Sequence, residues 1–169
     1  MKHALLVAAA TLAAAFAAAP ASAQSDAVDR VITVTAIEHE MRRSQERTPF
    51  PNTLEIYPEL EASGGYKLTP PDESGEWAAR AYQWAPGVII VNEGERVALE
   101  FFGVNGDHHP TSIEGYDIAF DVRRGELTRI VFTADKPGLF NVTCDMHRPS
   151  MTAQLLVLPA RLRRAADSR

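Results

Sequence analysis

A short segment near the end of the chain combines three side chains that bind soft metal ions. Cys144, His147 and Met151 offer a thiolate, an imidazole and a thioether, and this set favours copper over magnesium or calcium. The segments 139–142 and 153–158 on either side are rich in apolar and β-branched residues. We therefore expect two strands to hold the ends of the loop and bring the three side chains to one ion.

Cys144 is the only cysteine in the sequence, so it cannot form a disulfide within the chain. Three roles remain, namely an intermolecular disulfide, a buried inert thiol or a metal ligand. His147 and Met151 beside it favour the metal ligand.

The first residues carry the pattern of a secretory leader. Lys2 precedes an apolar, alanine-rich run that ends in Ala21-Ser22-Ala23, which predicts a signal peptide at 1–23, cleaved after Ala23. Its short, alanine-rich form is typical of bacteria, so we expect a periplasmic protein without a membrane span after cleavage.

The remaining chain has the size and charge of one soluble domain. We assign residues 24–160 to this domain and residues 161–169 to a basic, flexible tail. The net charge is −5, and it becomes −6 when Lys2 is removed. A mildly acidic protein is a poor candidate for binding nucleic acid or an anionic membrane surface.

Short apolar runs separated by turn residues predict an all-β domain. Examples of the turns are Asn92-Glu93-Gly94-Glu95 and Asp135-Lys136-Pro137-Gly138, and this spacing is typical of a Greek-key β-sandwich. The predicted strands are 31–36, 79–84, 88–91, 96–102, 111–113 and 126–132, together with the two that flank the cysteine loop.

Residues 38–76 are predicted to be a long irregular insertion after the first strand. Glu38 to Arg47 is charged and predicts at most a short helix, and Thr48 to Glu76 is rich in proline and glycine. Such an insertion in a small domain is usually functional or mobile. We expect it to be a docking surface for a partner or a lid over the metal.

A fourth ligand is expected from the remaining histidines. Between the leader and Cys144 these are His39, His108 and His109. His108 and His109 lie in a predicted loop, 103–109, which two strands can place beside the cysteine loop at one end of a sandwich. From spacing alone either histidine can be the ligand.

The segment from Tyr82 to Leu158 resembles the cupredoxins, the blue copper proteins. The similarity lies in 86–97, in the run 109–118 and in 136–144 followed by His147 and Met151. The run 109–118 is similar to cupredoxin domains related to oxidase subunit II, among which single-domain secreted members are the nearest in appearance. The resemblance marks 77–158 as the best-matching core.

The resemblance implies a mononuclear copper site and electron transfer. It places His109, Cys144, His147 and Met151 on one ion that alternates between Cu(I) and Cu(II), with His108 as the alternative to His109. Met146 and Pro110 stand where many members have proline and asparagine, which puts the reduction potential and colour in question more than binding.

The same residues limit the chemistry. A dinuclear copper centre needs two cysteines, and a trinuclear oxidase site needs more histidines than this chain has. We therefore expect a monomeric one-electron carrier between redox proteins and not an enzyme. Copper delivery, storage or sensing, or a role as an accessory subunit, is the alternative, and a small copper enzyme would need an open position on the metal.

Other chemically notable residues have simpler interpretations. Trp77, Tyr82 and Trp84 are expected to be core and loop anchors, and Glu38-His39-Glu40-Met41 a solvated polar face in preference to a second metal site. Glu100 or Glu114 would replace Met151 as a ligand in a red copper variant.

Overall fold

The computed structural model describes residues 27–51, 56–62 and 64–160. The predicted signal peptide at 1–23 and the predicted tail at 161–169 lie outside these residues. Within the described part of the chain, no helix is long and apolar enough to cross a membrane.

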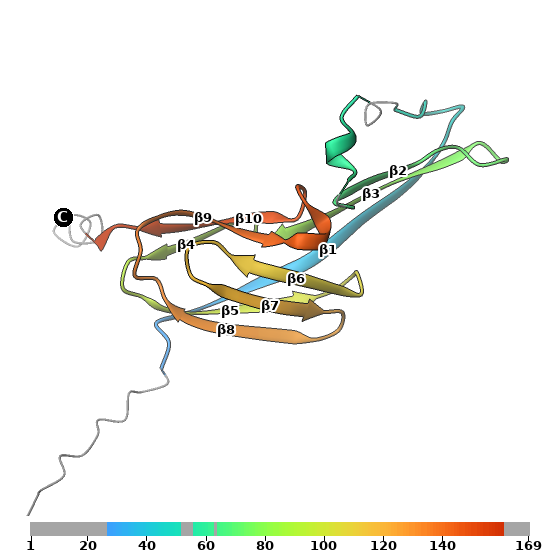
Figure 1. Ribbon diagram of the computed structural model, residues 1–169. Coiled ribbons are helices and arrows are strands. Elements are labelled where there is room, and N and C mark those ends of the chain that lie inside the picture. The colour runs from blue at the N-terminus through green and yellow to red at the C-terminus, as the bar shows by residue number, and fades with distance from the viewer. Residues whose placement is uncertain (1–26, 52–55, 63, 161–169) are drawn as a thin grey trace, which may run out of the picture.

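Two five-stranded sheets pack face to face in the described residues (Figure 1). The first sheet, in spatial order, contains β2 (Tyr66–Thr69), β3 (Glu76–Ala85), β1 (Arg30–Ser44), β5 (Arg96–Gly103) and β8 (Leu127–Thr133). The second contains β4 (Val88–Asn92), β10 (Thr152–Leu158), β9 (Gly138–Cys144), β6 (His108–Ile113) and β7 (Ile118–Arg123). This arrangement confirms the predicted β-sandwich.

Alternating side chains build the core between the sheets. In β10, Ala153, Leu155 and Val157 are buried, because successive residues of a strand point to opposite faces. The opposing sheet contributes Val34 from β1 and Phe101 from β5, both fully buried. The alternation that predicted these strands is therefore the pattern that forms the core.

The first strand is much longer than predicted, and the suggested helix at 38–47 is wrong. β1 runs to Ser44 and pairs with β3 as far as Glu76. Its charged residues are matched across the strands, with Arg80 Nη2 2.9 Å from Glu40 Oε2 and Arg42 Nη1 3.1 Å from Glu76 Oε1. Such cross-strand pairs stabilise an exposed antiparallel ladder, and the polarity of this segment concealed them.

The predicted irregular insertion at 38–76 is therefore regular at both ends. The strands β1 and β3 project beyond the sandwich and carry β2 (Figure 1). Between β1 and β2 lies a short 3₁₀ helix, η2 (Pro58–Leu60). Trp77 anchors this part as predicted, because its Nε1–H donates to the carbonyl of Thr48 at 2.7 Å and its ring packs on Phe50.

Two strand details differ from the prediction near the metal-binding residues. β7, which pairs with β6, was not predicted. β6 begins at His108, so both histidines lie in a strand and not in a loop. Because β6 also pairs with β9 at Thr111 and Cys144, the sheet brings the His109 and Cys144 segments together.

Candidate metal centre

The strand position of the two histidines decides which one faces the interior. Side chains alternate along a strand, so neighbours in β6 point to opposite faces. His109 is fully buried, whereas His108 points outward and its Nδ1 lies 3.2 Å from Asp121 Oδ1. The structure therefore places His109 at the interior position and His108 away from it.

The hydrogen bonding of His109 leaves one ring nitrogen available. Its Nε2 lies 2.8 Å from the carbonyl oxygen of Asn105, so this nitrogen carries the proton and donates it to the carbonyl. The Nδ1 atom then keeps its lone pair, as required of a neutral metal-binding imidazole. It points toward Cys144 and His147.

Cys144, at the end of β9, has no exposed surface. Its Sγ lies 3.4 Å from His147 Nδ1 and 3.9 Å from His109 Nδ1, and the two nitrogens are 3.2 Å apart. Among the described residues, these three side chains form the one cluster of His, Cys and acidic groups suited to holding a metal.

The triangle has the size of a metal site. A point equidistant from its three atoms lies about 2.0 Å from each, and metal–imidazole and metal–thiolate bonds are about 2.0–2.3 Å long. An ion of this size fits with little movement of the three residues. Two imidazoles and one thiolate are also the donor set of trigonal copper sites.

Met151 joins the group through the backbone of the loop. The short helix η3 (Asp145–His147) follows Cys144. The Cys144 amide then donates to the Met151 carbonyl at 3.0 Å, and the Met151 amide donates to the His147 carbonyl at 2.9 Å. Met151 is fully buried, so its thioether lies in the interior at the metal-binding end of the sandwich.

Burial disfavours charge on all three clustered residues. It raises the pKa of Cys144, although hydrogen bonds from the Met146 and His147 amides oppose this shift. It lowers the pKa of His109. It also lowers the pKa of His147 to about 4, and the nearby His109 adds to the effect. The histidines are therefore neutral near pH 7, the form that binds metals.

Two aromatic residues contact the histidine rings, and the sequence did not indicate this. Tyr82 stacks on His147 with ring centroids 3.8 Å apart, and Trp84 meets His109 edge to face at 5.9 Å. Trp84 is also a core anchor, as predicted, because it packs on Phe101. The period-two pattern of 82 and 84 predicts a common face but not what that face touches.

The role of Gly106 was not revealed by the sequence either. A Cβ atom at this position would lie 2.5 Å from Cε1 and 2.7 Å from Nε2 of His109. Its φ of +79° also lies in the region that glycine adopts most readily. The chain therefore passes so close to the His109 ring that only glycine fits without displacement.

The other candidate ligands lie in different surroundings. Glu100 pairs with Arg129, and Glu114 accepts hydrogen bonds from Asn141. In the segment 38–41, Glu38 and Glu40 both pair with Arg80. The structure brings none of these carboxylates into the cluster around Cys144.

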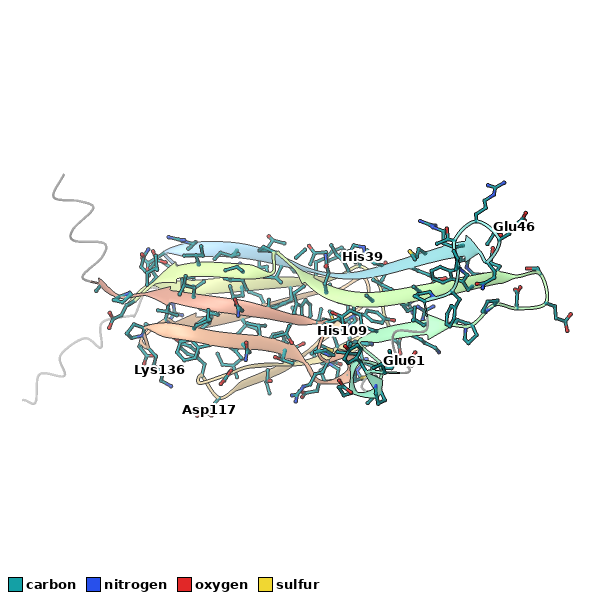
Figure 2. The ribbon with its side chains drawn as sticks, turned by 90° about the horizontal axis from the view of Figure 1, so that it is seen from above. His39, Glu46, Glu61, His109, Asp117 and Lys136 are labelled. Carbon is teal, nitrogen blue, oxygen red and sulfur yellow. The ribbon has the colours of Figure 1, made fainter. Side chains whose placement is uncertain are left out.

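His109 lies inside the sandwich at the end that carries the inserted residues (Figure 2). Lys136 and Asp117 lie at the opposite end, and Glu46 marks the tip of the projecting strands. The cluster is thus close to the base of the projection formed by β1, β2 and β3.

No protein-family model and no curated protein matches the sequence, but solved structures are similar in fold. One is a copper nitrite reductase from Nitrosomonas europaea (18% identity, TM-score 0.49, covering 79% of this chain and 42% of that chain). Another is auracyanin A, a "blue" copper protein from Chloroflexus aurantiacus (15% identity, TM-score 0.39, covering 44% of this chain and 88% of that chain). A third is a chain of a heme-copper terminal oxidase (17% identity, TM-score 0.40, covering 44% of this chain and 56% of that chain).

All three likenesses have TM-scores below 0.5 and sequence identities below 20%. The likeness is one of fold. This chain spans only 56% of the oxidase chain and 42% of the reductase chain, so their activities are not carried over. The assignment of the metal centre rests on the geometry of His109, Cys144 and His147.

Proposed function

We propose that this protein is a periplasmic, mononuclear copper protein that carries one electron at a time between redox partners. The observation that supports the proposal most directly is the buried triangle of His109 Nδ1, Cys144 Sγ and His147 Nδ1. Met151 is the proposed fourth, axial ligand, because it is fully buried and is tied to Cys144 and His147 through the backbone.

The bound copper would supply a Cu(I)/Cu(II) couple, and the chain would keep its ligands in one arrangement through the redox change. The Asn105 carbonyl fixes the ring and the proton position of His109. The amides of Met146 and His147 stabilise the Cys144 thiolate. Burial of Cys144 and His109 excludes water from two of the ligands. A dry, fixed site suits fast electron exchange because few groups reorganise.

The electron is proposed to pass through His147. This residue is partly exposed, whereas His109, Cys144 and Met151 are fully buried. Met146 beside it is 46% exposed, and Arg148 and Pro149 are exposed as well. These side chains form the proposed rim that a redox partner would contact.

Copper delivery, storage or sensing is the second candidate function. The inserted residues are the reason to consider it, since Gly65 lies directly against the backbone of His147 and Arg148, and a partner that displaced this contact would free the loop for ion transfer. Reversible electrochemistry and the rate of copper loss to a chelator separate the two functions. Fast electron exchange with slow loss supports the carrier, and the reverse supports delivery.

The experiment that tests the copper centre is a visible and EPR spectrum of the Cu(II)-loaded protein without residues 1–23, compared with Cys144→Ser. We expect an intense thiolate-to-copper absorption that disappears in the variant. If the protein is colourless and binds copper equally well without Cys144, the carrier proposal fails.

A further inference from the structure

His147 is the ligand that the strands hold least directly. His109 lies in β6 and Cys144 in β9, and these strands pair with each other. His147 ends the three-residue helix η3, which belongs to neither sheet. The position of its ring therefore depends on contacts made by the loop itself.

One such contact comes from residues 64–66 of the insertion, here called the clamp segment. A Cβ atom on Gly65 would lie 2.4 Å from the Arg148 carbonyl oxygen and 2.6 Å from that of His147. Real Cβ atoms do not approach backbone this closely, so Gly65 permits a contact that any other residue would prevent. The neighbouring Gly64 approaches the Met146 carbonyl oxygen, at 3.4 Å from its own Cβ position.

The carbonyl of Gly65 also joins the loop to β3. It accepts a hydrogen bond from Ser150 Oγ at 2.6 Å and another from the Tyr82 amide at 3.2 Å. Ser150 Oγ additionally lies 3.3 Å from the His147 carbonyl oxygen. The clamp segment is therefore bonded to the loop that carries His147 and to the strand that carries Tyr82.

Tyr82 contacts the side chain of His147, whereas the clamp segment contacts its backbone. Its ring stacks on His147 at 3.8 Å with an interplanar angle of 25°. The hydroxyl of Tyr82 interacts with Glu38 and Arg80, which pair with each other at 2.7 Å. These residues belong to β1 and β3 where the two strands leave the sandwich, so the projection itself holds Tyr82 in place.

We propose that the clamp segment and Tyr82 together position His147, and that they set the rate at which bound copper leaves the protein. This role of the inserted residues rests on the copper function proposed above. For His147 to leave the ion, its ring must slide off Tyr82 and the loop must separate from Gly65. Both contacts oppose that movement, whereas His109 and Cys144 are held by the sheet.

The test compares four variants that separate these contacts from general effects. Gly65→Ala places a methyl group against the loop backbone, and Gly87→Ala is its control because neither glycine has a positive φ and a Cβ at 87 meets nothing within 4 Å. Ser150→Ala removes the bond to Gly65. Ser74→Ala is its control, because that hydroxyl donates to Asp72 in a different turn.

The measurement is transfer of Cu(I) from the loaded protein to the chelator bathocuproine disulfonate. We expect Gly65→Ala to release copper at least about tenfold faster, given the cost of overpacking against rigid backbone. We expect Ser150→Ala to be about fivefold faster, as for loss of one hydrogen bond. Both controls should release copper at the wild-type rate.

Tyr82 variants test positioning apart from packing. Tyr82→Phe keeps the stacking ring and loses only the hydroxyl contacts with Glu38 and Arg80, so it should shift the EPR parameters and the reduction potential less than Tyr82→Leu, which removes the ring. Circular dichroism checks that each variant is folded. Ser150→Ala, a change at a partly exposed loop residue, keeps the test decisive if Tyr82→Leu does not fold.

The clamp is overturned if wild type, Gly65→Ala and Ser150→Ala release Cu(I) at equal rates while the Cu(II) forms of all three keep the thiolate-to-copper absorption. Equal acceleration in the two controls would overturn it as well. Failure of the copper proposal looks different, because the wild-type protein would then lack that absorption before any release is measured.

Discussion

The two histidines of the centre are held in different ways. His109 is fully buried in β6, with its Nε2 bonded to Asn105 and its ring confined by Gly106 and Trp84. His147 is partly exposed on η3 and is held by a ring stack and by contacts from an inserted segment. The sheet thus holds one histidine of the site, and the loop, with the inserted segment against it, holds the other.

The two histidines should differ most in whether added imidazole can replace them after substitution by glycine. In His147→Gly, added imidazole should reach the opening and restore the visible absorption of the copper protein, because this position is partly exposed. In His109→Gly, it should not, because no surface of His109 is accessible. Titration of both variants with imidazole, followed by absorption, measures this. Equal rescue would show that the two positions do not differ in access.

Gly106 sharpens the comparison on the side of His109. Gly106→Ala should lower copper affinity by about tenfold or more because the methyl group overlaps the His109 ring. Gly125→Ala is the matched control, since its φ of +78° nearly equals the +79° of Gly106 and a Cβ there meets nothing within 4 Å.

Competition with a copper chelator gives the affinities. Thermal unfolding of the metal-free proteins gives the backbone cost shared by the two variants, about 1–2 kcal/mol for an L-residue in the left-handed region. If both variants lose the same affinity, the effect is backbone strain and not contact with His109.

A smaller effect is expected from pH in the metal-free protein. Burial lowers the pKa of His147 from its ordinary 6.5 to about 4. Between these two pH values the unfolded chain binds a proton at His147 and the folded chain does not. Stability should therefore be fully present above about pH 6.5 and fall as the pH drops toward 4.

Urea unfolding at a series of pH values measures this, and His147→Gln should show a shallower decline. An identical pH profile in that variant would assign the proton uptake to other groups. His109, whose pKa burial also lowers, should account for part of the remaining decline.

The smallest effect is expected at His108. His108→Ala should leave the absorption and EPR spectra of the copper protein unchanged, because this ring points away from Cys144 and pairs with Asp121. Its matched partner is His109→Ala, which should abolish the spectrum. A loss of the copper signal in His108→Ala would reverse the assignment of the two histidines.

The sequence predicted the sandwich and the side chains that cluster at one end of it because both depend on local patterns. Alternating apolar residues and turn residues identify strands, and a cysteine, a histidine and a methionine close together identify a soft metal loop. The choice between His108 and His109 depended on one further fact, that β6 begins at His108. A strand boundary placed a few residues late concealed which side chain faces inward.

The parts that were not predicted depend on contacts between distant segments. β1 continues to Ser44 because β3 supplies partners for its charges, and no window around 38–47 contains that information. The same holds for the stacking of Tyr82 on His147 and for the approach of Gly65 to the loop. A β-sheet protein of this kind is specified largely by pairings that only the folded chain displays.

The register between β1 and β3 has a consequence for engineering. Ser44 lies opposite Glu76, and neighbouring strands are about 5 Å apart, so the chain leaves the ladder and returns to it at almost the same point. Residues 45–75 could therefore be replaced by a two-residue hairpin turn without changing the path of either strand. Such a replacement would also remove β2 and the clamp segment, so β1 and β3 would remain paired while the proposed contacts on the His147 loop would be lost.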